Sequence, residues 1–311
     1  MARLIATDVE YIWLTFCLIA LFLPSLRLPR RAIAWMAAST ARAVLIASLF
    51  PVVIRLLLLP WLPVRVPGIH DEFGHLLTAE TLSLGRLANP APELWSHFET
   101  FHIYFQPVYA SIYFPGNSIC MALSFALFGH PWPGVLLSMA LLCGAAVWSL
   151  ERWLPRHWAL WGGVLMGLRF GVVGYWMNSY WGGAMAALGG VLLIGAIGPR
   201  RPFHGVAFGI GCAVLLFTRP FEGLIAVVVV VLSAGVWRFG IRLVPAFAIG
   251  AVAMTAFGYY NFRLTGDALT PPYRVTAKLY NDGNVCRACR VPPMSSFDTP
   301  NCVGLPMSLR R

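Results

Sequence analysis

Hydrophobic residues along the chain gather into long runs, which short polar or basic segments separate. The runs lie at about 10–26, 43–64, 111–129, 132–150, 158–177, 183–199, 205–218, 222–237 and 243–260. A helix needs about 20 apolar residues to cross the hydrocarbon of a bilayer, so the shorter runs must tilt little or lie in thinned lipid. The pattern predicts an all-α fold, a polytopic transmembrane protein with about eight membrane helices.

The composition supports this class and excludes others. Hydrophobic residues make up 59% of the chain and charged residues 11%, and the mean hydropathy is +0.71. Such values are not those of a soluble domain of this length. The net charge of +11 comes almost entirely from arginine. Because the arginines are scattered between apolar runs and form no basic stripe, we expect no nucleic-acid partner.

The arginines predict the topology, since basic residues are held on the cytoplasmic side of a membrane. They mark the turns at 27–42, 152–156, 200–201 and 238–242. If these turns are cytoplasmic, the loop 65–110 and the turns at 178–183, 219–222 and 261–267 face outward. This arrangement requires that the run 111–129 does not cross fully but forms a re-entrant or surface-lying helix; otherwise the charge rule fails at one of these turns.

The outer loop 65–110 carries the most conspicuous polar cluster, His70-Asp71-Glu72. Five of the twelve acidic residues of the chain fall between positions 71 and 99. Carboxylates beside a bilayer are costly unless they are paired, coordinated or used, so the cluster predicts a functional site. A solvated polar loop is the alternative interpretation.

An amphipathic helix lying on the membrane surface is expected over residues 71–87, because this stretch has few helix breakers and spaced apolar residues. Asp71 and Glu72 then occupy its first turn, where free N–H groups favour negative charge. Helix capping is thus a structural explanation for Asp71, but it explains neither Glu72 nor His70.

Two further outward turns carry candidate site residues. The first contains Asn178, Tyr180 and Trp181, and the second contains Arg219 and Glu222. With the acidic cluster, they bring carboxylates, an arginine, an amide and aromatic rings to one membrane face. Each also has a structural explanation: the aromatic side chains suit an interfacial belt, and Arg219 with Glu222 suits a pair at helical spacing.

The order of these features resembles the GT-C class of membrane glycosyltransferases, and most of all the bacterial relatives of protein mannosyltransferases and of the aminoarabinose transferase of lipid A. The likeness covers about residues 50–265. It rests on an acidic motif at the start of the first outer loop, an amphipathic helix and a train of short helices. The short motifs that carry it are Asp71-Glu72, Gly129-His130-Pro131-Trp132, residues 175–183 and Arg219-Pro220-Phe221-Glu222-Gly223.

The resemblance implies an inverting hexosyl or pentosyl transfer from a polyprenyl-phosphate donor to a lipid, glycan or protein acceptor, at the periplasmic face of a bacterial inner membrane. Asp71 is then the general base and Glu72 a metal or acceptor ligand, or the reverse. Arg219, or a divalent cation (Mg or Mn) on Asp71 and Glu72, stabilises the leaving phosphate. The residues expected to bind substrate are His70, His102, Asn178, Tyr180, Trp181, Arg219 and Glu222.

The chain departs from that class at both ends. The run 10–26 is an extra apolar segment, and the chain ends at residue 311 where such enzymes carry further membrane helices. We therefore expect residues 1–269 to form the catalytic membrane region and the C-terminus to be truncated or altered. Residues 270–311 are polar and rich in proline, which predicts a disordered tail. The alternative is a small zinc or disulfide module on Cys286, Cys289 and Cys302.

Other classes remain as alternatives. A transporter would need charged residues near the bilayer midplane and repeated halves, and the sequence shows few such charges and no internal repeat. A metalloprotease would need His-Glu-x-x-His, and residues 70–75 have the wrong spacing. A zinc site on the four histidines between 70 and 102, and a non-catalytic membrane scaffold, stay open.

Overall fold

The computed structural model describes residues 30–98, 100, 102–197, 204–234 and 243–281. Within these ranges the fold is mostly helical, as expected of an all-α protein. The α-helices are α2 (Arg30–Met36), α3 (Thr40–Leu57), α4 (His70–Ser83), α5 (Gly116–Phe128), α6 (Trp132–Leu150), α7 (Arg156–Met166), α8 (Ala184–Ala196), α9 (His204–Thr218), α10 (Pro220–Ala234), α11 (Val244–Thr265) and α12 (Pro272–Asn281). Shorter turns of helix are η1 (Trp95–His97), η2 (Gly167–Val172) and η3 (Tyr175–Met177).

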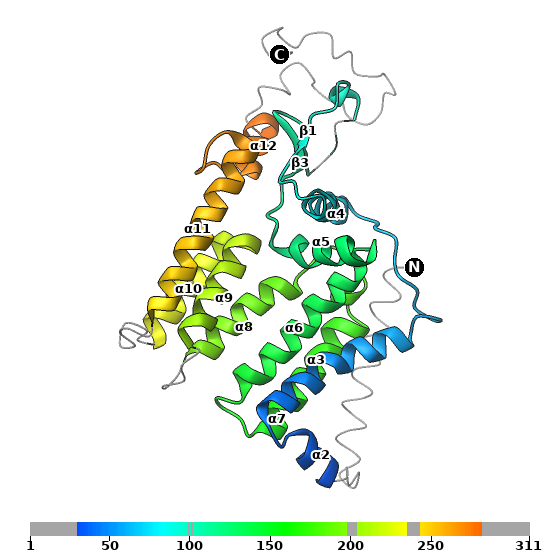
Figure 1. The fold of residues 1–311 in the computed structure, drawn as a ribbon, viewed down its shortest axis with the longest axis vertical. Coiled ribbons are helices and arrows are strands. Elements are labelled where there is room, and N and C mark those ends of the chain that lie inside the picture. The colour runs from blue at the N-terminus through cyan, green and yellow to red at the C-terminus, as the bar shows by residue number, and fades with distance from the viewer. Residues whose placement is uncertain (1–29, 99, 101, 198–203, 235–242, 282–311) are drawn as a thin grey trace, which may run out of the picture.

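The longer helices form one continuous array. Helix α6 packs against α3, α7 and α8, α8 packs against α9, and α9 packs against α11. Beyond one end of this array lie α4, a small sheet and α12, while α2 lies at the opposite end (Figure 1). Segments that are far apart in the sequence therefore meet at the end that carries α4.

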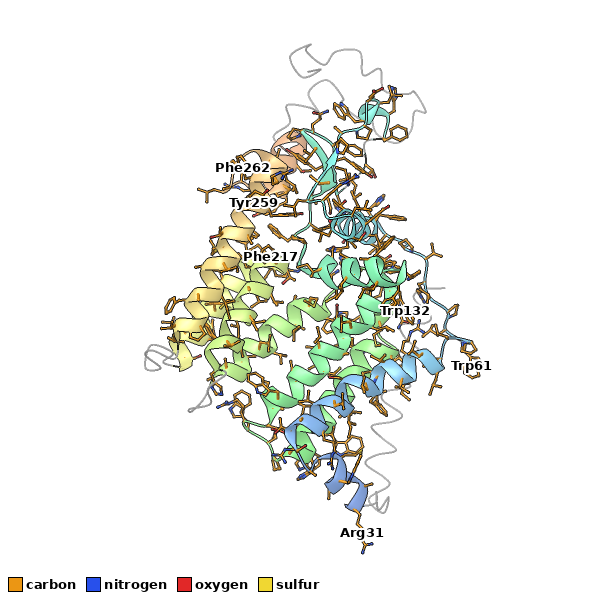
Figure 2. The ribbon with its side chains drawn as sticks, viewed as in Figure 1. Arg31, Trp61, Trp132, Phe217, Tyr259 and Phe262 are labelled. Atoms are coloured by element: carbon orange, nitrogen blue, oxygen red, sulfur yellow. The ribbon has the colours of Figure 1, made fainter. Side chains whose placement is uncertain are left out.

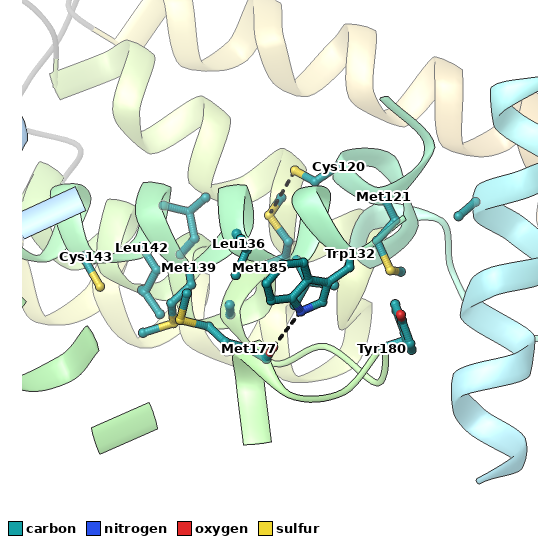
Figure 3. Close-up of a cluster of buried hydrophobic side chains, with 14 of the residues drawn as sticks. Cys120, Met121, Trp132, Leu136, Met139, Leu142, Cys143, Met177, Tyr180 and Met185 are labelled. Carbon is teal, nitrogen blue, oxygen red and sulfur yellow. Dashed lines mark hydrogen bonds between the residues drawn. The ribbon is translucent and has the colours of Figure 1, made fainter. Parts of the chain in front are cut away.

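The main hydrophobic core lies where α5, α6 and α8 meet the segment before α8. Met139, Leu142 and Met177 are fully buried there. The indole Nε1 of Trp132 donates a 3.0 Å hydrogen bond to the carbonyl of Met177 (Figure 3). This bond fixes the segment 174–183, which carries one of the predicted outer turns.

The helical class is confirmed, whereas the expected number of about eight membrane helices stays a prediction. Among the described residues, two helices are long and apolar enough to cross a membrane, α3 and α6. Four other apolar helices, α5, α8, α9 and α10, have 13 to 15 residues. The run 10–26 lies outside the described residues. An apolar run shows where a helix can form, but the residues within and beside the run decide where the helix ends.

Two of the runs show how the helices become short. The run 111–129 begins in a strand and gives only α5, which at about 1.5 Å per residue is shorter than the hydrocarbon. The run 158–177 gives α7, then the single π-turn η2 and the 3-10 turn η3. It contains repeated glycines, which weaken a helix interior.

Residues 65–110, the predicted outer loop, hold a sheet that the all-α prediction did not include. Its strands are β1 (Asn89–Pro90), β2 (Ile103–Tyr104) and β3 (Val108–Ser111), and β3 pairs antiparallel with both neighbours. Asn89 pairs with Tyr109, and Ile103 pairs with Ser111. The sheet packs against α4, so it places the loop residues around 102–113 beside the acidic cluster.

Helix α4 is present where the sequence predicts an amphipathic helix. Glu72, His75, Thr78 and other small or polar residues are buried, whereas Phe73 is exposed. The polar face of α4 therefore points into the protein. The outer faces of α10 and α11 carry large exposed apolar side chains, with Tyr259 and Phe262 among them on α11 (Figure 2).

The expected disordered tail, residues 270–311, begins differently. Residues 272–281 form α12, and the Tyr273 ring lies 5.8 Å from the Phe114 ring and 6.1 Å from the Phe221 ring. Ordering this segment costs conformational entropy, which its polar residues cannot offset by burial. The aromatic contacts of Tyr273 supply the stabilisation that offsets this cost. Residues 282–311, which include the three tail cysteines, lie outside the described residues.

Candidate functional site

Glu72 joins the start of α4 to a distant turn. Its side chain is buried at 5% exposure. One carboxylate oxygen accepts hydrogen bonds from the N–H groups of Gly68 (2.8 Å) and Ile69 (3.3 Å), and the other accepts from the N–H of Tyr180 (2.9 Å). Glu72 is therefore the carboxylate that caps α4, and the capping explanation given to Asp71 from sequence is wrong.

Asp71 points to a different group of side chains. The hydroxyl of Tyr113 donates a 2.7 Å hydrogen bond to Asp71 Oδ1, and His102 Nδ1 lies 2.7 Å from the same oxygen. Burial and the contact with Asp71 raise the pKa of Tyr113, so its hydroxyl stays protonated and keeps donating. The backbone of His102 is left-handed, with φ of 67°. Such a conformation costs energy and persists only where the surroundings hold it.

A cavity of about 390 Å³ opens beside Asp71. Its wall comes from α4, the β3–α5 connection, the turn before α8, the α9–α10 junction and α12. The residues that line it are Asp71, His75, Ile112, Tyr113, Phe114, Asn117, Trp181, Gly183, Ala186, Thr218, Arg219, Pro220, Phe221, Glu222 and Tyr273. The three outer connections that the sequence singles out thus meet in one cavity.

Arg219 is the cation of this cavity wall. Its Nη1 lies 3.4 Å from Glu222 Oε1, and both side chains are exposed. An exposed pair of this kind contributes at most about 1 kcal/mol, so an anion can take over the guanidinium. Arg219 directly precedes α10, whose N-terminal dipole and free N–H groups also favour negative charge. This part of the cavity suits a phosphate group.

The close approach of two helix ends sets the position of Arg219. A Cβ atom built on Gly116, at the start of α5, would lie 2.6 Å from the carbonyl oxygen of Phe217 and 2.6 Å from the Thr218 side chain. Only glycine permits this contact. The end of α9, and Arg219 after it, can therefore lie against the helix start that follows Tyr113 and Phe114.

Asn178 supports the site but does not line the cavity. Its amide group donates to the carbonyls of Gly174 (2.7 Å) and Val172 (3.1 Å), and its oxygen accepts from Arg55 Nε (2.8 Å). Arg55 is fully buried in α3. The turn that carries Trp181 and the N–H of Tyr180 is thus tied to α3 through the Asn178 side chain.

Three other predicted substrate-binding residues have separate places. The Tyr180 side chain is buried in the core. His102 contacts Asp71 directly. His70 lines a second cavity of about 500 Å³, on the other side of α4, together with Phe73, Leu76, Leu77, Glu80, Thr100, Ile103 and Tyr109. Of the predicted residues, Asp71, Trp181, Arg219 and Glu222 share the first cavity.

Several residues that line the cavity were not among those predicted from the sequence. Tyr113 lies in an aromatic stretch that the sequence shows, but nothing there connects it with Asp71. His75 lies four residues after Asp71, a spacing that places both on one face of a helix. This spacing was the sequence feature from which His75 could have been placed beside Asp71. Tyr273 falls within the segment expected to be disordered.

The predicted divalent-cation site on Asp71 and Glu72 does not fit the arrangement. Both Glu72 oxygens accept hydrogen bonds from backbone N–H groups, and the carboxylates point to different partners. Among the described residues, no group of three or more histidine, cysteine or acidic side chains is placed to hold a metal ion. Of these two carboxylates, only Asp71 is among the residues that line the cavity, and one carboxylate is a poor ligand set for Mg²⁺ without a substrate phosphate.

His75 gives the site a pH-dependent stability. Burial lowers the pKa of its ring to about 4, with Asp71 raising it and Arg219 lowering it further. The unfolded chain therefore binds more protons between pH 6.5 and 4, and stability must fall as the pH falls through this range. A shift of this size corresponds to about 3 kcal/mol. We expect thermal unfolding of the detergent-purified protein to show this loss, and a His75→Gln variant to lack most of it. An equal pH dependence in both proteins would contradict the assignment.

No protein-family model, curated protein or solved structure matches the chain. The geometry of the cavity and its residues is therefore the basis for a functional conclusion.

Proposed function

We propose that the protein is a membrane glycosyltransferase that moves a sugar from a polyprenyl-phosphate donor to a periplasmic lipid, glycan or protein acceptor. The observation that carries the proposal is the cavity that Asp71 and Arg219 share. A carboxylate and a phosphate-binding cation in one cavity, walled by aromatic rings, are the groups that such a transfer needs. The resemblance to GT-C enzymes supports the same reaction.

The chemistry follows from these two side chains. The acceptor hydroxyl attacks the anomeric carbon and forms the new glycosidic bond, while its proton passes to the Asp71 carboxylate. The bond between the anomeric carbon and the phosphate oxygen breaks, and its electron pair leaves with the polyprenyl phosphate. Arg219 and the N-terminus of α10 stabilise the charge on the departing phosphate. Attack opposite the leaving group inverts the configuration at that carbon.

Glu72 takes no part in the transfer itself in this proposal. It is a positioning residue, because its oxygens hold the start of α4 and the Tyr180 N–H together. Tyr113 and His102 orient the Asp71 carboxylate through their short contacts with Oδ1. No step is routed through a metal ion.

The lipid part of the donor has a place beside the cavity. Phe221 lines the cavity and is 63% exposed, and the exposed apolar residues Leu224, Ile225 and Val228 continue along α10. An exposed apolar face of this kind suits lipid rather than water. The phosphate then binds at Arg219, and the prenyl chain follows α10 into the membrane.

The membrane topology supplies a prediction of its own. We propose a multi-pass arrangement in a bacterial inner membrane, with the cavity on the periplasmic side. Single cysteines at Trp181 and Glu222, in a cysteine-free background, should react with an impermeant thiol reagent in cells whose outer membrane alone is permeable. A cysteine at Leu154, at the opposite end of α6, should react only after the inner membrane is opened. All three side chains are exposed. The reverse pattern would invert the proposed orientation.

The reaction itself is tested by sugar transfer. The purified full chain is placed in vesicles with polyprenyl phosphates that carry tritiated glucose, galactose, mannose or arabinose, and with extracted membrane acceptors. We expect label in the acceptor and free polyprenyl phosphate in equal amounts. Label that stays on every donor would refute the proposal. Label that crosses the bilayer while still attached to its lipid would show a transporter instead.

A further inference from the structure

His75 is a buried polar side chain whose hydrogen bonding is incomplete. It lines the first cavity, is 8% exposed, and its Nδ1 is buried with no hydrogen-bond partner. Its ring stacks on Tyr113 at a centroid distance of 4.8 Å, and its carbonyl accepts a 2.8 Å bond from Ser118. Buried polar groups are nearly always partnered, so a histidine held in this way requires an explanation.

The surroundings decide which ring nitrogen carries the proton. A buried N–H without an acceptor is costly, whereas a nitrogen lone pair without a donor costs less, so the proton belongs on Nε2. Nδ1 is buried and His75 lines the cavity, so we infer that Nε2 is the nitrogen available to a ligand there. His75 therefore presents one uncharged N–H donor at neutral pH, an assignment that its low pKa supports.

The position of this donor relates it to the reacting groups. His75 follows Asp71 by one helical turn on the same face of α4, so their Cβ atoms lie about 6 Å apart. Arg219 lines the same cavity, from the junction of α9 and α10. A sugar whose anomeric carbon lies beside Asp71, with its phosphate at Arg219, then extends along α4 toward His75. The separation is about the width of a pyranose ring.

We propose that His75 donates a hydrogen bond to a hydroxyl oxygen on the far edge of the donor sugar, at C3 or C4, and thereby determines which sugars the cavity accepts. This inference rests on the proposed glycosyl transfer and adds a specificity-determining residue to it. An uncharged donor suits a hydroxyl oxygen, whereas the phosphate, which carries charge, is left to Arg219. A site built to bind one hydroxyl rejects analogues that lack it, because its own polar group is then buried without a partner.

The test is a set of deoxy donors. Farnesyl phosphates carrying glucose, galactose, mannose or arabinose first identify the sugar that the wild-type chain prefers. Its 2-deoxy, 3-deoxy and 4-deoxy forms are then compared with it by kcat/KM. We expect the wild type to discriminate against the 3-deoxy or the 4-deoxy form by about 100-fold, and to treat the 2-deoxy form more leniently. A wild type that accepts all three equally would overturn the proposal.

Two variants assign the discrimination to His75. His75→Leu should reduce the ratio between the parent and the sensitive deoxy donor to a few-fold, while His75→Gln, which keeps an N–H donor, should retain part of it. The ratio does not depend on the amount of folded protein, so a destabilised variant still gives an answer. An unchanged ratio in His75→Leu would overturn the proposal.

Binding separates this inference from the proposed function. Quenching of Trp181 fluorescence, measured against a Trp181→Phe control, reports occupancy of the cavity without turnover. If no donor is transferred but the deoxy donor binds more weakly and His75→Leu removes the difference, the transfer is refuted and the hydroxyl contact stands. If transfer occurs and the binding ratios are unaffected by His75→Leu, the contact is refuted and the transfer stands.

Discussion

An Asp71→Asn protein should fold like the wild type and transfer sugar at least about 100-fold more slowly, the usual contribution of a general base. Asparagine keeps the shape of the side chain, and its oxygen can still accept the hydrogen bond from Tyr113. It cannot take a proton from the acceptor hydroxyl. Initial rates at equal protein concentration measure the loss, and near-ultraviolet circular dichroism with thermal unfolding shows that the fold is retained.

The matched control is Glu93→Gln, which makes the same chemical change at an exposed carboxylate of the same outer loop. It does not line the cavity, so it should leave the rate within about twofold of the wild type. If Asp71→Asn retains more than a tenth of the wild-type rate, Asp71 is not the base.

Substitution of the adjacent carboxylate, Glu72, should mainly reduce stability, whereas substitution of Asp71 should mainly reduce the rate. Glu72→Gln puts an amide N–H₂ where a carboxylate oxygen accepts from backbone N–H groups, so at least one buried N–H loses its acceptor. We expect a loss of unfolding free energy on the order of 3 kcal/mol, since hydrogen bonds to charged groups are strong and unpaired buried donors are costly. Denaturant unfolding of the purified protein in detergent measures it.

The two variants together distinguish a catalytic role from a structural one. Asp71→Asn should lose rate and keep stability, whereas Glu72→Gln should lose stability, and its remaining folded fraction should keep more activity than Asp71→Asn. A Glu72→Gln protein as stable as the wild type would show that the three backbone contacts contribute little, and it would return Glu72 to the list of candidate bases.

The sequence predicts that three connections lie on one side of the protein, because arginines mark the turns between them. Asp71, Trp181 and Arg219 accordingly line one cavity. The different roles of the neighbouring carboxylates Asp71 and Glu72 could not be predicted from the sequence. Adjacent helical residues point about 100° apart, and one of the partners that hold Glu72 inward is the Tyr180 N–H, 108 positions along the chain.

The lengths of the helices and the presence of α12 also could not be predicted from the local sequence pattern. Hydropathy marks residues 158–177 as one run, but the chain leaves the α-helix after Met166 and turns twice before Asn178. Those turns are stabilised by hydrogen bonds from the Asn178 side chain, which α3 holds through Arg55. Helix α12 likewise packs through ring contacts of Tyr273 with Phe114 and Phe221. These contacts cannot be predicted from residues 270–281 alone, because the partner rings are distant in the sequence.

The central claim is that the cavity beside Asp71 binds the phosphate end of a lipid-linked sugar, and photo-crosslinking tests it most directly. A polyprenyl-phosphate sugar with a diazirine on the first prenyl unit is irradiated with the purified full chain, and the labelled peptides are mapped by mass spectrometry. We expect attachment within residues 112–117 or 217–228, which line the cavity and continue along the exposed apolar side of α10, with labelling abolished by unlabelled polyprenyl phosphate. Attachment elsewhere on the protein, or labelling that the competitor does not reduce, would contradict it.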